Sequence, residues 1–329
     1  MTQFARPNRR HLITRLAAAA LLPLAGAARA ARFPERPVTI VVPFAPGGIA
    51  DLTARAVAEH MARSLGQAFV VDNKPSAGSI VASQAVAGAK PDGHTLLLMS
   101  NGNAVSVGLF KKLPYDTQKD FAPISLLGSF DIGVFVAASS RFARLADAVA
   151  FAKANPGKLN IGTIAVGSTQ HLAAKLFETV AGIDALVVPY RGSPAVLTAL
   201  RAGEIDLAFE IVGPMVPQVS AGVVKALAVS SDKRNPALPE VPTVQQAGVA
   251  GYNVASWNAL AAPAGTSADV IATLNRAARE AVASAEVQER LGKLGMRLAA
   301  SSPAELQALL ASEVKRWGDV IRAAKIEPE

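Results

Sequence analysis

Arg36-Pro-Val-Thr-Ile-Val-Val-Pro-Phe-Ala-Pro-Gly-Gly-Ile-Ala-Asp51 is the stretch of sequence that decides the fold. Its β-branched run, Val38 to Val42, is typical of a buried strand. Gly47 and Gly48 lack a Cβ, so the turn after the strand can take positive φ and bring bare N–H groups against a ligand. A helix begins at or just before Asp51, and its first N–H groups lack partners and carry partial positive charge. The stretch favours an anion, a carboxylate or a phosphate, and we expect one wall of a carboxylate-binding cleft here.

The N-terminal residues 1–30 have the pattern of an export signal. Basic residues precede the apolar run Leu16 to Ala25, and Ala28-Arg29-Ala30 is an Ala-x-Ala cleavage site. The pair Arg9-Arg10 fits a twin-arginine signal about as well as a general secretory (Sec) signal. We therefore expect residues 1–30 to be removed and the mature chain, beginning near Ala31, to lie outside the cytoplasm.

Composition excludes several kinds of protein. The chain of 329 residues is long enough for a large core and usually for two domains. Without the leader it keeps 28 basic and 25 acidic residues, a net charge of +3 with no basic stripe, so nucleic acid is not an expected partner. The absence of cysteine excludes disulfides, thiolate metal sites and a cysteine nucleophile. No second long apolar run follows the leader, so a soluble mature protein is expected.

Strands and helices alternate along the mature chain. Short β-rich runs, separated by helical segments and by glycine or proline turns, lie at residues 68–71, 96–99, 124–127, 134–137, 159–162, 185–188 and 204–209. The alternation predicts parallel sheets with right-handed crossovers. Residues 100–103 are expected to be a turn. The chain after residue 266 is helical, so we expect it to pack back on the first domain, with strands crossing between lobes near Leu127 to Val134 and Trp257 to Ala261.

Seven short motifs, in order across the whole mature chain, match those of a known family. They are Arg36-Pro37 with Val42 to Gly48 and Asp51, Pro91 to Leu97, Leu113 to Asp116 with Lys119 to Ile124, His171 to Ala173, Val188 to Gly192, Leu238 to Thr243, and Ala262 to Thr266. Each motif alone is weak, but seven in the same order are specific. The chain thereby resembles the Bug-type periplasmic substrate-binding proteins of tripartite tricarboxylate transporters.

The resemblance implies an α/β fold, that of type II periplasmic binding proteins, with two Rossmann-like lobes joined by two crossing strands. We expect residues 31–131 and 257–329 to form the first lobe and residues 132–256 the second. The resemblance also implies a periplasmic receptor, not an enzyme, that holds a small carboxylate-containing solute between its lobes and passes it to integral membrane transporter subunits. No cofactor and no metal are expected, and the receptor is expected to be a monomer.

The resemblance places the binding site on loops from both lobes. The main contributors are the loop after the first strand and the matching loop near residue 167, with further residues from neighbouring turns. The candidate ligand-binding residues are Phe44, Gly47, Gly48, Ile49, Ala50, Asp51, Ser79, Ser100, Asn101, Thr163, Gly167, Ser168, Thr169, His171, Tyr190, Arg191, Gly192 and Glu210. The chain departs from the family at residues 80–82, where Asn-Ile-Gly is common, and at residue 210, where aspartate is more usual.

Several of these side chains have a second interpretation. Asp51 can cap or orient its helix, and a carboxylate there would repel an anionic ligand. Tyr190 can donate to a carboxylate or pack against its loop, and Arg191 can pair with a second carboxylate or remain in solvent. His171 fits a structural residue better than an acid or a base. Glu210 can accept from an amine or from a protonated acid, or it can orient loop amides.

Catalytic machinery is not evident. The mature histidines, His60, His94 and His171, lie on different predicted elements, so a zinc cluster is not expected. The chain has no Gly-x-Ser-x-Gly elbow, Walker loop or Gly-x-Gly-x-x-Gly turn. An exported hydrolase or isomerase that uses Asp51, His171 or Glu210, and a solute sensor for a signalling partner, are the alternative functions.

Overall fold

The computed structural model describes residues 1–2, 33–323 and 326–328. Apart from its first two residues, the predicted export signal, residues 1–30, lies outside this part of the chain. Within the described part, no helix combines the length and the apolar character that crossing a bilayer requires.

The described residues contain alternating strands and helices. The strands are β1 Val38–Val42, β2 Phe69–Asn73, β3 Thr95–Ser100, β4 Phe121–Ala137, β5 Leu159–Ile164, β6 Ala185–Tyr190, β7 Leu207–Ile211, β8 Val224–Val229, β9 Ala255–Pro263 and β10 Arg297–Leu298. The helices are α2 Ile49–Leu65, α3 Ile80–Ala87, α4 Asn101–Leu109, α5 Leu145–Ala154, α6 Thr169–Ala181, α7 Ser193–Ala202, α8 Val212–Ser220, α9 Ala268–Ala283, α10 Ala285–Gly292 and α11 Pro303–Ala323, with a short 3₁₀ turn at Ala77–Ser79.

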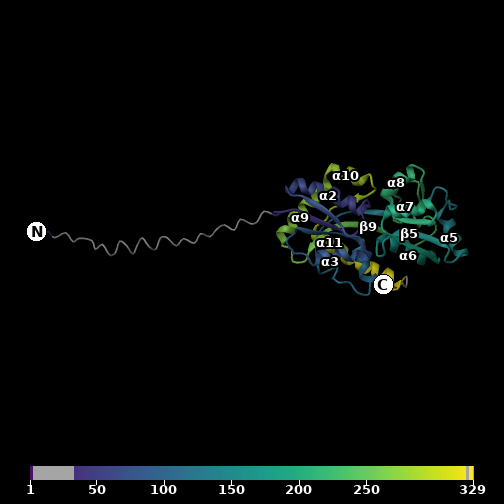
Figure 1. Cartoon of the computed structure of the whole chain (residues 1–329), viewed down its shortest axis with the longest axis horizontal. Helices are drawn as coiled ribbons and strands as arrows, with labels where there is room; N and C mark the ends of the chain where they lie inside the picture. The colour runs from purple at the N-terminus through teal and green to yellow at the C-terminus, as the bar shows by residue number, and fades with distance from the viewer. Residues whose placement is uncertain (3–32, 324–325, 329) are drawn as a thin grey trace.

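The strands form a continuous sheet whose two halves belong to different lobes, which lie side by side in Figure 1. The order is β2-β1-β3-β9-β4 in the first half and β4-β7-β5-β6 in the second, and β8 and β10 also pair with β4. Strands β1 to β3 pair in parallel, as do β5 to β7, whereas β4 and β9 run antiparallel to their neighbours. The predicted α/β fold, with two lobes joined by crossing strands, is confirmed.

Strand β4 joins the two lobes. Its residues Phe121 to Asp131 pair with β9, whereas Ile132 to Ala137 pair with β7 and β8. The prediction of two separate strands, 124–127 and 134–137, is wrong, because β4 is one strand of 17 residues. The segment between the two predicted runs, residues 128–133, contains two glycines and lacks the sequence pattern of a strand. Its backbone nevertheless pairs with β9 up to Asp131 and with β7 and β8 from Ile132 onward.

The crossing point of β4 carries a buried carboxylate. Asp131 is 1% exposed and accepts hydrogen bonds from Arg297 at 2.7 and 3.0 Å and from Asn235 Nδ2 at 2.8 Å. Arg297 belongs to β10 beside the first lobe, and Asn235 follows β8 of the second. One side chain therefore links both lobes where the chain passes between them.

The C-terminal helices pack on the first half of the sheet. Helix α9 lies against β4 and α2, and α11 lies against α4 and β4. Trp317 of α11 is fully buried, and its Nε1 donates to Asn101 Oδ1 at 2.9 Å and to Glu313 Oε2 at 3.0 Å. Helices from the C-terminal part of the chain therefore pack beside elements from its N-terminal part.

Helix α4 replaces the turn predicted at residues 100–103. Ser100 Oγ accepts from the Gly102 N–H at 3.2 Å, and the Ser100 N–H donates to Asn103 Oδ1 at 2.9 Å. These reciprocal caps start a helix in a segment whose glycine and asparagine content does not favour one. Helix α8 was not predicted either, because Pro217 lies inside it.

Candidate functional site

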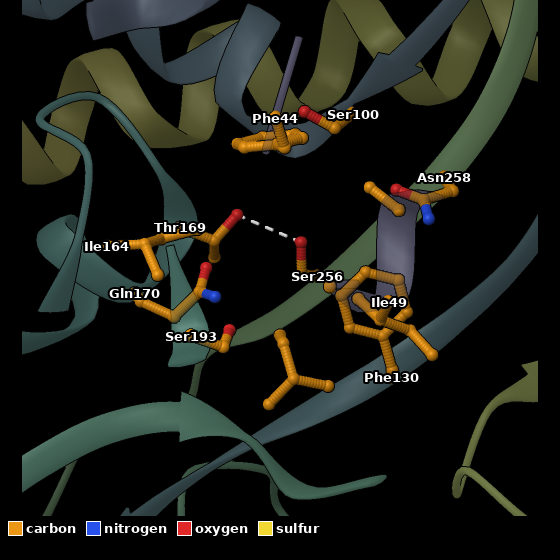
Figure 2. Close-up of a pocket in the computed structure, with 13 residues that line it drawn as sticks. Phe44, Ile49, Ser100, Phe130, Ile164, Thr169, Gln170, Ser193, Ser256 and Asn258 are labelled. Carbon is orange, nitrogen blue, oxygen red and sulfur yellow. Dashed lines mark hydrogen bonds between the residues drawn. The ribbon is translucent and has the colours of Figure 1, made fainter. Parts of the chain in front are cut away.

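A cavity lies between the two lobes and contains about 400 Å³ of empty space, including its mouth. Figure 2 shows hydroxyl and amide groups projecting into it between aromatic and aliphatic side chains. Its lining residues are Phe44, Gly48, Ile49, Ala50, Ser100, Phe130, Ile164, Thr169, Gln170, Ser193, Ile211, Ser256 and Asn258.

The turn between β1 and α2 forms the first wall. Gly47 has φ +87° and Gly48 occupies the N-cap position of α2, so the first amides of the helix face the cavity through Ile49 and Ala50. The Gly47 N–H donates to Asp51 Oδ2 at 3.0 Å. The helix start can therefore offer backbone donors to an anion.

Asp51 orients this turn. Its buried carboxylate accepts from Arg55 Nε at 3.0 and 3.1 Å in addition to the Gly47 N–H. Burial by itself would raise the pKa of Asp51, but the hydrogen bonds from Arg55 and Gly47 outweigh it and hold the pKa below its ordinary value. Arg55 also donates to Asn73 Oδ1 at 3.2 Å, and Asn73 donates to the Phe44 carbonyl at 2.9 Å. The network fixes both ends of the glycine turn.

The start of α6 forms the matching wall in the second lobe. Gly167 has φ +80°, and Ser168 Oγ caps the helix by accepting from the His171 N–H at 3.1 Å. The next residue, Thr169, lines the cavity, and its Oγ1 lies 2.9 Å from Ser256 Oγ (Figure 2). A second set of free helix amides thus meets the same cavity.

The two walls touch each other in this structure. The Gly78 N–H of the first lobe donates to the Val166 carbonyl of the second at 2.9 Å, and Asn101 Nδ2 donates to Thr169 Oγ1 at 3.2 Å. A Cβ added to Gly167 would lie 2.7 Å from the Gly78 Cα, so only glycine permits this approach. The lobes are therefore closed over the cavity.

Asn258 on β9 is a lining residue that the sequence did not indicate. It is 1% exposed, and within the described part of the chain neither Nδ2 nor Oδ1 has a hydrogen-bond partner. Figure 2 shows its amide at the edge of the cavity. A buried amide without a partner is unfavourable, so this group is free to bind a ligand. The only sequence signal was the alternation of polar Ser256 and Asn258 along a crossing strand.

Glu210 lies behind the second-lobe wall. It is 1% exposed, and its Oε2 accepts from Ser193 Oγ at 2.9 Å and from the Ile211 N–H at 3.3 Å. Burial raises the pKa of Glu210 to about 7, although hydrogen bonds from Ser193, Ile211 and Gln170 act in the opposite direction. Ser193, Ile211 and Gln170 line the cavity, whereas Glu210 does not.

Comparison with known proteins identifies the family. Residues 53–326 match the family model described as "Tripartite tricarboxylate transporter family receptor". The chain belongs to this family. The family is one of solute-binding receptors, not of enzymes.

Three solved structures resemble this receptor closely. The periplasmic binding protein BugD is 32% identical, with a TM-score of 0.86 over 90% of this chain and 100% of BugD. MatC from Rhodopseudomonas palustris, solved with bound malate, is 34% identical, with a TM-score of 0.84 over 88% and 100% of the two chains. A second R. palustris protein, solved with adipate, is 33% identical, with a TM-score of 0.86 over 90% and 100%. The predicted Bug-type resemblance is confirmed.

The structure brings six of the predicted site residues to the cavity of this receptor. They are Phe44, Gly48, Ile49, Ala50, Ser100 and Thr169. Gly47, Asp51, Gly167 and Ser168 lie directly behind this wall and shape its turns, and Asn101 holds Thr169. Ser79 is buried at the start of α3, with φ +60°, close to the Gly102 backbone.

The remaining predicted residues lie away from the cavity lining. Thr163 is the penultimate residue of β5, and its hydroxyl donates to the Ile164 carbonyl at 3.0 Å. His171 borders a separate hollow with Lys175 and Glu178, and burial lowers its pKa to about 4. At the end of β6, Tyr190 is half-buried and Arg191 is exposed.

The pair Ser193-Pro194 predicts a helix with Ser193 as its N-cap and Pro194 as its first residue, but helix α7 begins one residue earlier. Gly192, not Ser193, is the N-cap, and Ser193 is the first helical residue. A Cβ on Gly192 would lie 3.3 Å from the Ala45 Cβ of the opposite lobe. The shift places the Ser193 hydroxyl at the cavity instead of over the helix end.

Proposed function

We propose that this receptor captures a small carboxylate between its lobes, in the periplasm, and delivers it to integral membrane subunits of a tripartite tricarboxylate-type transporter. The observation that carries the proposal is the meeting of two helix N-termini, those of α2 and α6, at one cavity. Free helix amides carry partial positive charge and suit carboxylate oxygens. The buried amide of Asn258, unpartnered among the described residues, adds a side-chain donor.

Uncharged donors are sufficient for useful affinity. Each hydrogen bond to a charged group contributes roughly 1.5 to 3 kcal/mol. About four such bonds give roughly 6 to 12 kcal/mol, a range that includes the ~8 kcal/mol of micromolar binding, and any surplus offsets the lost freedom of ligand and lobes. Arg55 is already paired with Asp51, so it does not serve as the ligand's counter-ion.

We infer that residues 31–131 and 257–329 move as one lobe and residues 132–256 as the other. The change of partners in β4 between Asp131 and Ile132 supports this boundary. Because the donors lie on both lobes, only the closed form satisfies the ligand, and binding shifts the hinge equilibrium toward closure. The closed monomer is then the form that the transporter subunits recognise.

The similar structures support the class of solute. Malate and adipate, bound in two of them, are both small aliphatic dicarboxylates. The apolar lining residues Phe44, Ile49 and Phe130 would contact the carbon chain of such a solute.

Isothermal titration calorimetry of the mature protein against aliphatic and aromatic mono-, di- and tricarboxylates tests the proposal. We expect stoichiometric binding of at least one acid, with a negative heat-capacity change from closure and no chemical change in the ligand. Mass spectrometry of ligand released from the purified protein would name the solute. Turnover of a carboxylate, abolished by His171→Ala, would overturn the receptor in favour of an exported enzyme.

A further inference from the structure

The second-lobe end of the cavity carries a hydroxyl whose hydrogen is already committed. Ser193 Oγ donates to Glu210 Oε2 at 2.9 Å. A serine hydroxyl has one hydrogen and two lone pairs. Once the hydrogen is given to Glu210, the oxygen can only accept from a ligand.

The direction of this hydrogen bond is fixed when Glu210 is ionised. A carboxylate has no hydrogen to donate, and its Oε2 accepts from the Ile211 N–H at 3.3 Å as well as from the Ser193 hydroxyl. The ionised Glu210 thus holds Ser193 as an acceptor.

Among the described residues, the groups that contact Glu210 are neutral. On β4 it pairs with Gly133, on α6 it faces Gln170 and on α7 it faces Ser193. Across the described residues, no ion pair includes Glu210. A second ligand carboxylate at this end would meet the oxygen lone pairs of Ser193, whose hydrogen is committed to Glu210.

A hydroxyl group fits the same place. It donates its hydrogen to Ser193 Oγ and can accept from the Ser193 N–H. Elsewhere in the first turn of α7, Pro194 has no N–H, and the Ala195 and Val196 N–H groups donate to the Gly192 carbonyl. An ammonium group cannot accept from the Ser193 N–H. The neighbouring side chains Ile164 and Ile211 suit the carbon chain that leads to the hydroxyl.

We propose that Glu210 is a positioning residue that turns Ser193 into a hydrogen-bond acceptor, so that the receptor selects a carboxylate bearing a hydroxyl at its distal end. This inference rests on the proposed function, because the ligand's first carboxylate is taken to lie at the starts of α2 and α6. It names the subclass of acid that the cavity prefers.

Calorimetry with chain-matched acids tests the inference. At each of four, five and six carbons, the probes are the unsubstituted acid, the ω-hydroxy acid, the ω-amino acid and the dicarboxylic acid. We expect the ω-hydroxy acid of the best length to bind about tenfold more tightly than the other three, the effect of one added hydrogen bond or one avoided mismatch.

Three variants separate positioning from structure. Ser193→Ala should remove the preference. Glu210→Met should also remove it, because the freed serine hydrogen can then donate to a dicarboxylate. Glu210→Gln should keep it, because the amide oxygen still accepts from Ser193.

The failures are distinguishable. If no acid of any length binds, the proposed function fails and the inference with it. If acids bind but the dicarboxylic or amino acid is preferred, or if Glu210→Met keeps the hydroxy preference, the inference alone is overturned.

Discussion

Replacing Asn258 by leucine should weaken ligand binding and, at the same time, stabilise the ligand-free protein. The side chain is 1% exposed, and within the described chain its amide has no hydrogen-bond partner. A hydrogen bond from this amide to a carboxylate is worth roughly 1.5 to 3 kcal/mol, which is a loss of roughly 10- to 150-fold in affinity. Leucine has a similar volume but no polar atom to leave unsatisfied.

The stability change has the opposite sign. An unsatisfied buried polar group costs about 1 to 3 kcal/mol, part of which solvent in the cavity relieves. We therefore expect the free energy of unfolding of ligand-free Asn258→Leu to rise by about 1 kcal/mol, as measured by urea denaturation. Affinity is measured by calorimetry with the tightest acid of the carboxylate panel.

Asn275→Leu is the matched control. Asn275 Nδ2 donates to the Ile124 and Ser301 carbonyls at 2.7 and 2.8 Å, away from the cavity. This variant should lose about 1 to 3 kcal/mol of stability and keep its affinity. If Asn258→Leu instead loses stability while its affinity stays unchanged, the amide is structural and the reasoning is refuted.

Three further predictions concern closure, pH and the hinge. Gly167→Ala should weaken binding at least about tenfold, because its Cβ would lie 2.7 Å from Gly78 of the opposite lobe. Gly182→Ala is the control: its φ is similar and nothing lies within 4 Å, so it should lose only about 1 kcal/mol of stability. Calorimetry measures the affinity of both variants, and small-angle scattering measures how far each one closes. The raised pKa of Glu210 means that the folded protein binds an extra proton between pH 4.5 and about 7, so its contribution to stability falls by about 3 kcal/mol as pH rises through that window. The lowered pKa of His171 acts in the opposite direction, because stability is lost as pH falls from 6.5 to about 4. In the wild-type protein the two effects nearly cancel, so in urea titrations Glu210→Gln should lose stability as pH falls. An unchanged pH profile would contradict the shifted pKa values of both Glu210 and His171. Arg297→Met should lower the free energy of unfolding by about 2 kcal/mol, measured by urea denaturation. The loss is smaller than for a fully buried ion pair because the Arg297 side chain is 50% exposed. Equal stability would show that the buried carboxylate of Asp131 does not need Arg297.

Local chemistry made the first wall of the cavity predictable. A strand, two glycines and a helix start follow one another in the sequence, and the geometry of helix N-termini then supplies the anion site. The same reasoning found the start of α6. In both places the relevant residues are neighbours in the chain, so no knowledge of the tertiary structure was needed.

The other lining residues depend on the tertiary structure. Asn258 and Ser256 lie on a strand, and a polar residue in a strand is usually explained by solvent; only the crossing between lobes places them at the cavity. Gln170 lines the cavity and His171 does not, because consecutive helical residues point about 100° apart and the sequence does not show which faces the cavity. The extent of β4 was missed because its pairing partners lie in two different lobes.

A crystal structure of the mature protein with the tightest acid of the panel tests the central claim most directly. The account predicts a ligand carboxylate within hydrogen-bonding distance of the amides that begin α2 and α6, with the Asn258 amide in the same shell. A carboxylate bound elsewhere, or held by the side chain of Arg191 with those helix amides left free, would contradict it.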